Sequence, residues 1–272
     1  MRMDLATKKA ALTRHAEFTR PHRLCGEYLG LSGDDAESLT TLLQSRPGPA
    51  PNHRLYCRHL DSSAVRALSM DPAIIDVVRH FIGNNVMLWL STFWIKAAED
   101  PDTPWHQDVW FWDGTIPTVT VWVALTEARK DTGCLRFLPG SCNRIWPHAA
   151  PLGAAGLGYV SSVPVNDDKE VCVELEAGEF VAFNERVLHR SLSPRSKTPR
   201  IAFVARYSSP RHRLPHGKLP LFPGHVSLIV HGQDRYRVNP TQGVDWFWTD
   251  SCQNTNGAIG MHFGCRPAFP VP

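Results

Sequence analysis

The sequence predicts a mainly β protein with a jelly-roll or sandwich core and flanking helices at its N-terminal end. Short runs rich in β-branched and aromatic residues follow one another through the middle of the chain, each bounded by Gly, Pro or Asp. No helical segment separates these runs, which argues against a parallel sheet with crossover helices. The expected strands are residues 86–96, 119–125, 134–138, 171–175, 179–183 and 200–208.

Helices are expected mainly before residue 86. One is expected over residues 34–43, and a second over residues 72–81, where Pro72 takes the first helical position. Asp71 can cap the free backbone N–H groups of the second helix, and Gly83 can end it. The whole chain is therefore expected to be one domain, 1–272, comprising mainly helical support (1–85), a jelly-roll core (86–210) and a C-terminal extension (211–272).

Length and composition narrow the class of protein. A chain of 272 residues with 43% hydrophobic and 20% charged residues is ordinary for a soluble globular protein. Its net charge of +3 is too mild to indicate nucleic acid or a membrane surface as partner. With neither a signal peptide nor an apolar span, we expect a cytoplasmic protein. The seven cysteines include no Cys-x-x-Cys pair and are expected to be free thiols.

The segment PWHQDVWFWDG, residues 104–114, carries a candidate metal site. In an extended chain alternate side chains face the same way, so His106 and Asp108 can offer a nitrogen and an oxygen to one ion. His189, in NERVLHRS, can complete the set. Two histidines and one carboxylate leave about three positions open, which is typical of Fe(II) oxygenases. The same ligands suit zinc, so a zinc-dependent hydrolase is a second interpretation.

Arg200 favours the oxygenase. It follows His189 by eleven residues, across the turn SPRSKTP, so a hairpin return would bring it beside the metal. Its fork of donors can grip a carboxylate with two parallel hydrogen bonds. The distal carboxylate of 2-oxoglutarate needs such a grip, and Ser191 can add a hydroxyl donor. Because a zinc hydrolase gives Arg200 no role, the spacing predicts Fe(II) and 2-oxoglutarate as cofactors, with O₂ as co-substrate.

Three motifs resemble the phytanoyl-CoA dioxygenase family: WHQD, GCLRFLPGS at residues 133–141, and His-x-Ser with an Arg eleven residues after the His. The resemblance runs from about residue 71 to residue 209 and implies a double-stranded β-helix, a cupin-like jelly-roll. The family usually continues the PGS turn with His, where this chain has Cys142; because the turn is structural, we expect little catalytic effect. The resemblance implies His106, Asp108 and His189 as catalytic iron ligands, Arg200, Ser191 and Trp122 as 2-oxoglutarate-binding residues, and Trp112 as a substrate-lining residue. Trp110 and Gln107, beside the metal motif, are further substrate-lining candidates.

The predicted reaction is oxidation, most simply hydroxylation, of a C–H bond in a small organic molecule, with succinate and CO₂ as co-products. Asp108 argues against halogenation, because related halogenases leave the carboxylate position vacant for chloride. Desaturation, cyclisation and epimerisation stay open, as does a non-catalytic metal-binding jelly-roll protein. The many aromatic residues near the motif suggest a natural-product tailoring enzyme. The glycine-rich residues 152–159 are expected to form a lid. The sequence predicts neither the substrate nor the oligomeric state.

Overall fold

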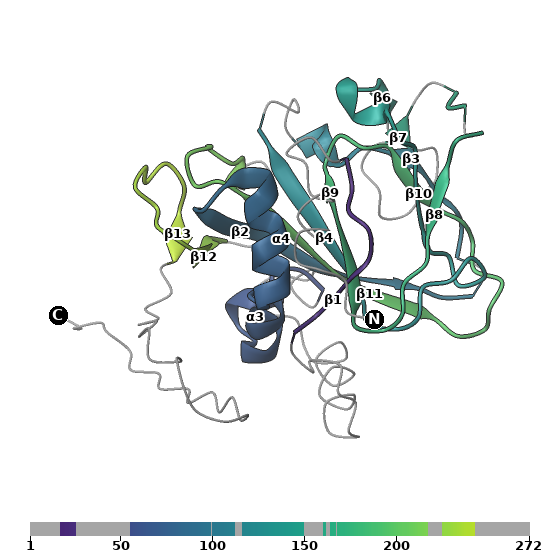
Figure 1. Cartoon of the computed structure of the whole chain (residues 1–272), viewed down its shortest axis with the longest axis horizontal. Helices are drawn as coiled ribbons and strands as arrows, with labels where there is room; N and C mark the ends of the chain where they lie inside the picture. Colours follow the sequence, from purple (N-terminus) through teal and green to yellow (C-terminus); the bar gives the residue numbers. More distant parts are fainter. Residues whose placement is uncertain are drawn as a thin grey trace, which may run out of the picture.

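The computed structural model describes residues 17–25, 55–98, 100–111, 116–149, 160–161, 164–166, 168–216 and 225–242. The helix expected over residues 34–43 and the lid expected over residues 152–159 lie outside these ranges. Within them the fold is mainly β, with two main sheets and two α-helices (Figure 1). The predicted fold class is therefore confirmed.

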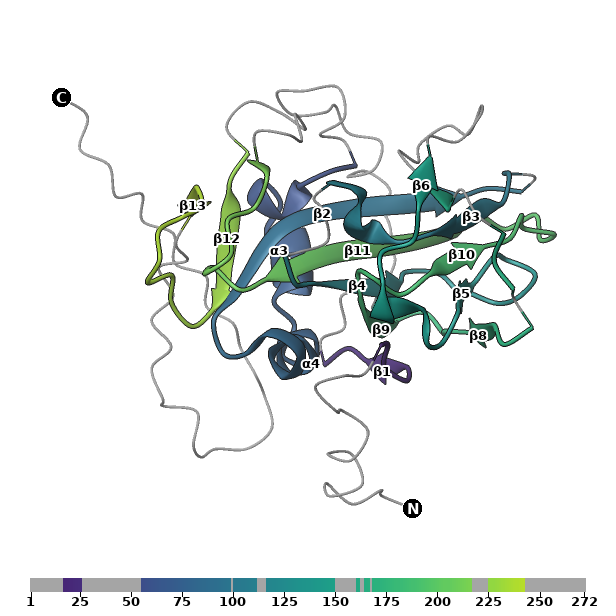
Figure 2. The ribbon, with the colours of Figure 1, turned by 90° about the horizontal axis from the view of Figure 1, so that it is seen from above.

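A seven-stranded sheet and a four-stranded sheet make up the core. The large sheet has the order β1-β9-β4-β11-β2-β12-β13 and the small sheet the order β3-β10-β5-β8, while β6 and β7 pair separately. Figure 2 shows β2, β11 and β4 side by side, with β3, β10, β5 and β8 grouped at one end of them. The strands are β1 His22–Arg23, β2 Val86–Lys96, β3 Thr103–His106, β4 Thr118–Ala124, β5 Leu135–Phe137, β6 His148–Ala149, β7 Val160–Ser161, β8 Val171–Val173, β9 Glu179–Asn184, β10 His189–Ser191, β11 Arg200–Ser208, β12 Ser227–His231 and β13 Thr241–Gln242.

The two longest strands, β2 and β11, have the bounds that the sequence predicts. They pair antiparallel from Arg200 opposite Lys96 to Ser208 opposite Met87. The large sheet extends beyond the core segment, residues 86–210, that the sequence predicts. Strand β1, from the supposed helical support, pairs with β9, and β12, from the supposed extension, pairs with β2. Both flanking segments therefore contribute strands to the large sheet.

Helix α4, Pro72–Ile82, begins and ends where its sequence signals indicate. The Asp71 carboxylate accepts a hydrogen bond from the Ala73 N–H at 2.8 Å, and Pro72 needs no backbone donor at the first helical position. Gly83 follows with φ of 89°, a conformation that is unfavourable for residues other than glycine. The shorter helix α3, Ser63–Ser69, was not predicted from the sequence.

The helices cover one face of the large sheet, as Figure 1 shows for α3 and α4. Ile74 and Val78 of α4 are fully buried in a cluster that includes Phe203 of β11. Tyr207 donates its hydroxyl to the Ser69 carbonyl oxygen of α3 at 2.8 Å. Each buried apolar side chain of this size contributes about 1.5–3 kcal/mol through removal from water. This layer buries the face of the large sheet that is turned toward the helices.

The other face of the large sheet packs against the small sheet. Trp122 and Val204 from the large sheet join Leu135 and Phe137 from the small sheet in a second buried cluster. Phe137 and Phe183 contact edge to face with ring centroids 5.0 Å apart. Side chains that point inward from either sheet therefore meet in the space where a jelly-roll carries its site.

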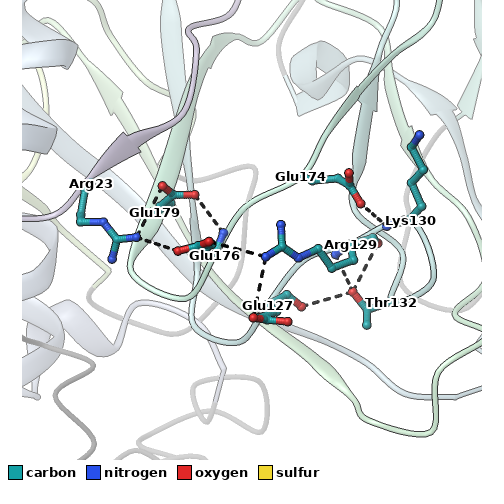
Figure 3. Close-up of polar contacts among 8 residues, drawn as sticks. All are labelled: Arg23, Glu127, Arg129, Lys130, Thr132, Glu174, Glu176 and Glu179. Atoms are coloured by element: carbon teal, nitrogen blue, oxygen red, sulfur yellow. Dashed lines mark hydrogen bonds and ion pairs between the residues drawn. The ribbon is translucent and has the colours of Figure 1, made fainter. Parts of the chain in front are cut away.

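A chain of charged residues at the sheet edge joins the loop after β4 to the turn before β9 (Figure 3). Arg129 lies 3.7 Å from both Glu127 and Glu176, and Glu176 in turn pairs with Arg23 at 3.0 Å. Thr132 accepts a hydrogen bond from the Arg129 N–H at 2.7 Å. Exposed pairs of this kind contribute little individually. Together with the backbone bonds they define the shape of the loop that leads into β5.

The described cysteines, residues 25, 57, 134, 142 and 172, are all free thiols, as expected. Among the described residues, no helix is long and apolar enough to cross a membrane.

Candidate metal centre and co-substrate site

His106 and His189 lie directly opposite each other on two neighbouring strands of the small sheet. His106 ends β3, His189 begins β10, and the two Cα positions are antiparallel partners. Their ring centroids are 4.1 Å apart, and Phe183 packs on the His189 ring at 4.8 Å. Both histidines are 5% exposed. The register between β3 and β10 thus brings together residues that are 83 positions apart in the chain.

Asp108 joins them by a different route from the one predicted. Strand β3 stops at His106, and Asp108 begins a 3₁₀ turn, Asp108–Phe111, instead of continuing an extended segment. The Asp108 N–H donates to the Glu185 carbonyl oxygen at 2.8 Å, which anchors the turn. Asp108 Oδ1 then lies 4.0 Å from Nε2 of both His106 and His189. The three ligand atoms lie within 4.8 Å of one another, which brings the predicted triad together.

The two rings present their Nε2 lone pairs to the centre of the triad. Nδ1 of His106 lies 2.9 Å from the Pro104 carbonyl oxygen, and Nδ1 of His189 lies 3.1 Å from that of Val187. A carbonyl can only accept, so Nδ1 carries the proton and Nε2 is left free. Burial lowers the pKa of His106 to about 3 and lowers that of His189 as well, so both rings are neutral. Two neutral imidazoles and one carboxylate fit a divalent iron ion.

Two residues that the sequence did not single out hold the Asp108 carboxylate. Thr120 of β4 donates its hydroxyl to Oδ2 at 3.0 Å, and Arg206 of β11 lies with Nη2 3.1 Å from Oδ1. Burial alone would raise the pKa of Asp108, but Arg206 and the two histidines outweigh it and hold that pKa well below its usual range. Asp108 is therefore an anionic ligand across the physiological pH range. Nearby, burial raises the pKa of Glu185 to about 7.

Arg200 is the first residue of β11, as the predicted strand bounds have it, and is 4% exposed. Its Nη1 donates to the Gly133 carbonyl oxygen at 2.9 Å, and its guanidinium lies 5.1 Å from the centre of the Trp122 ring. Its buried Nε has no hydrogen-bond partner among the described residues. Burial lowers the pKa of Arg200 to about 10, so it stays charged at neutral pH. A buried cation with an unused donor is well suited to an anionic ligand.

Lys96 completes this cluster, although no sequence motif pointed to it. It is the antiparallel partner of Arg200 and only 5% exposed. Its Nζ donates to Ser191 Oγ at 3.0 Å, to the Ser191 carbonyl oxygen at 3.1 Å and to Thr103 Oγ1 at 3.2 Å. Burial first, and the neighbouring Arg200 second, lower the pKa of Lys96 to about 8. Because Ser191 Oγ accepts from Lys96, its own O–H is left to donate elsewhere.

Gln107 does not fit its predicted place in the substrate cavity. Its Nε2 donates to the carbonyl oxygens of Arg144 and Arg186, and its Oε1 accepts from the Trp146 N–H at 2.8 Å. The side chain is fully buried and turned toward the loop after β5 because it alternates with His106 along the chain. Its polar atoms therefore brace that loop. The side chain of Trp110 and the whole of Trp112 lie outside the described part of the structure.

A jelly-roll with two histidines and one carboxylate gathered between its sheets defines a class, the non-haem metal proteins of this fold. A sequence profile of the family Phytanoyl-CoA dioxygenase (PhyH) matches residues 15–202, and the chain belongs to this family. The predicted resemblance is thereby confirmed.

Two relatives illustrate how far the sequence similarity extends. The chain is 29% identical over 116 residues to a probable alpha-ketoglutarate-dependent hypophosphite dioxygenase of Stutzerimonas stutzeri, covering 42% of this chain and 41% of the relative. It is 27% identical over 181 residues to the peroxisomal phytanoyl-CoA dioxygenase of Rattus norvegicus, covering 61% and 53% respectively. The matches thus span about half the length of these relatives.

Solved structures share the fold at low sequence identity. A protein described as non-heme monooxygenase, ThoJ apo, is 24% identical with a TM-score of 0.67, and each chain is covered to 85%. CytC3 with Fe(II) and alpha-ketoglutarate is 23% identical with a TM-score of 0.65, covering 86% of this chain and 92% of that one. The epimerase SnoN, in complex with Fe3+, alpha ketoglutarate and nogalamycin RO, is 19% identical with a TM-score of 0.60, covering 76% and 86%.

Proposed function

We propose that the protein is an Fe(II)- and 2-oxoglutarate-dependent dioxygenase that oxidises a C–H bond of a small organic molecule. One observation carries the proposal: buried Lys96 donates to Ser191, two residues along β10 from the metal-ligand candidate His189, and a second buried cation, Arg200, is the strand partner of Lys96. Two residues along a strand correspond to about 7 Å on the same face. This spacing suits a ligand with one end on the metal and a carboxylate at the other.

Each part of the site has a role in this proposal. His106, Asp108 and His189 hold the metal and leave one side of it open for other ligands. When bound, Fe(II) and 2-oxoglutarate supply the activation of O₂, with loss of CO₂ and formation of succinate. The backbone hydrogen bonds at Nδ1 keep both rings oriented, and burial excludes water from the reacting centre.

The distal carboxylate of 2-oxoglutarate would bind to Arg200 and Ser191. The unused Nε of Arg200 and the free O–H of Ser191 are donors for it, and Lys96 adds a second positive charge. Trp122, under the Arg200 guanidinium, would keep this cation in place. A zinc hydrolase that used the same triad would give these buried cations no role.

The substrate is proposed to be a small organic molecule, and the role a natural-product tailoring step. The similar fold of SnoN, whose structure is described in complex with nogalamycin RO, supports this class of substrate. Because Asp108 occupies the carboxylate position, oxidation without halogen transfer is the proposed outcome.

The direct test is succinate formation. Purified protein with Fe(II), ascorbate and 2-oxoglutarate is expected to release succinate in an O₂-dependent manner, slowly without substrate and faster with one. Arg200→Ala would need more 2-oxoglutarate for the same rate. Absence of succinate under all these conditions, together with tight zinc binding and hydrolysis of an ester or amide, would overturn the proposal in favour of the hydrolase.

A further inference from the structure

We propose that Arg206 is a second anion site, which holds an oxyanion of the substrate (a carboxylate, sulfonate or phosphonate) beside the metal triad. The proposal rests on the proposed function, because it names the substrate class of that same site. It starts from Arg206 itself, a cation that is only 7% exposed on the inner face of β11.

Arg206 and Arg200 occupy opposite ends of one strand. They are six residues apart, so both point toward the small sheet but stand about 20 Å apart along β11. Arg200 belongs with Lys96 and Ser191, whereas Arg206 lies against Asp108. One carboxylate at the Arg200 end of the site therefore cannot also satisfy Arg206.

The hydrogen bonds of Arg206 are incomplete. Its Nη2 lies 3.1 Å from Asp108 Oδ1, while its buried Nε has no hydrogen-bond partner in the described part of the chain. Nε and Nη2 lie on the same edge of a guanidinium, the edge that binds two oxygens of an oxyanion in parallel. A buried N–H without a partner is unfavourable, so this edge has capacity for one more acceptor.

Charge balance points the same way. Without metal, Asp108 and Arg206 neutralise each other. Asp108 Oδ1 is also the oxygen that faces both histidines, so a bound metal would draw its charge away from Arg206. The other buried carboxylate nearby, Glu185, accepts from the Thr118 N–H at 2.9 Å. With Lys96 and Arg200 opposed by a single distal carboxylate, the loaded site would keep an excess of buried positive charge. An anionic substrate group offsets that excess.

Two sources of oxyanion can be separated by experiment: the substrate itself, or the metal-bound carboxylate of 2-oxoglutarate. The Co(II)-loaded protein is titrated first with 2-oxoglutarate, and binding is followed by calorimetry and by the visible spectrum of the cobalt. Failure at this step counts against the proposed function and not specifically against the Arg206 site. The 2-oxoglutarate-saturated protein is then titrated with propanesulfonate and, as a neutral analogue of the same shape, with propanesulfonamide.

We expect propanesulfonate to bind and alter the cobalt spectrum, and propanesulfonamide to bind at least about tenfold more weakly. Arg206→Gln should weaken propanesulfonate binding about tenfold more than it weakens 2-oxoglutarate binding. Arg206→Lys keeps the charge but loses the forked arrangement of donors. Its affinity for propanesulfonate should lie between those of the unaltered protein and Arg206→Gln. Thr120→Val, which removes the other hydrogen bond to Asp108, should weaken propanesulfonate binding less than Arg206→Gln does.

Three results would overturn the proposal. The first is equal binding of propanesulfonate and propanesulfonamide to the unaltered protein, a comparison that needs no variant to fold. The second is a loss of 2-oxoglutarate affinity in Arg206→Gln with no change in anion binding, which would assign Arg206 to the co-substrate. The third is an equal loss of anion binding in Thr120→Val, which would mean that Arg206 acts only by positioning Asp108.

Discussion

Lys96 donates a hydrogen bond of 3.0 Å to Ser191, and so joins the longest strand of the large sheet to the strand that carries His189. The bond fixes the relative position of the two sheets at the point where the proposed co-substrate would span from metal to cation. The part of the site proposed to bind the distal carboxylate of 2-oxoglutarate therefore consists of three residues, Lys96, Ser191 and Arg200. The individual parts can be separated by mutation.

Arg200→Ala should weaken 2-oxoglutarate binding by about tenfold to a hundredfold, since a hydrogen bond between charged groups contributes about 1.5–3 kcal/mol. Arg200→Lys should recover part of the loss, because charge remains and only the fork is gone. Calorimetry with the Mn(II)-loaded protein measures this without turnover. Arg23→Ala, at a surface arginine whose side chain is 59% exposed, is the control. Unchanged affinity in Arg200→Ala would refute the proposed clamp.

The pH dependence of 2-oxoglutarate binding should report on Lys96. Its pKa is lowered from 10.5 to about 8, so the charged form that attracts the co-substrate is present below pH 8 and is lost as pH rises through that value. Affinity should therefore fall above about pH 8 in the unaltered protein. In Lys96→Met it should be lower throughout and independent of pH over this range. A matching fall in both proteins would assign the effect to another group.

Asp108→Ala should reduce metal affinity by at least about a hundredfold and abolish succinate formation, because one of three ligands and the only anionic one is removed. Binding of Co(II) or Mn(II) measured by calorimetry tests the ligand role independently of activity. Asp76→Ala, at a side chain that is 70% exposed on α4, should bind metal as the unaltered protein does. Retention of metal affinity by Asp108→Ala would remove the triad from the proposal.

Gly133→Ala should destabilise the fold and weaken 2-oxoglutarate binding together. Gly133 has φ of +79°, and a Cβ there would lie 2.7 Å from the Leu192 carbonyl oxygen. Its own carbonyl accepts from Arg200. We expect a loss of about 2 kcal/mol or more in the free energy of unfolding, measured by urea denaturation.

Gly83→Ala is the matched control for that variant. Gly83 has a similar φ of +89°, but a Cβ would meet nothing within 4 Å. Gly83→Ala should lose only about 1 kcal/mol in the free energy of unfolding and should bind 2-oxoglutarate normally. Equal effects of the two substitutions would show that backbone conformation alone accounts for Gly133.

Local signals predicted the elements that depend on local signals. Strands β2 and β11 carry long β-branched and aromatic runs, and α4 has an aspartate cap, a proline at its first position and a closing glycine. Strands β3 and β10 are only four and three residues long and contain polar side chains, so no periodicity marks them. Their pairing joins His106 to His189, which are far apart in the chain.

The prediction for Asp108 shows the same limit. An extended segment would present Asp108 on the same side as His106, but the structure ends the strand and makes a 3₁₀ turn, held by the Glu185 carbonyl oxygen. The two side chains still meet. The sequence therefore predicted correctly which residues come together, but the extended backbone conformation predicted for Asp108 was wrong.

By itself, the sequence determined the fold class, the family resemblance and the three residues offered to a metal, because these depend on residue type and order along the chain. Only the tertiary structure decided which charged residues serve the site. Lys96 and Arg206 look like ordinary surface cations on a one-dimensional reading, yet both are buried between the sheets. Strand register sets which face a side chain occupies, and register depends on pairing with strands far away in the chain. Pairing with distant strands therefore places Lys96 against Ser191 and Arg206 against Asp108.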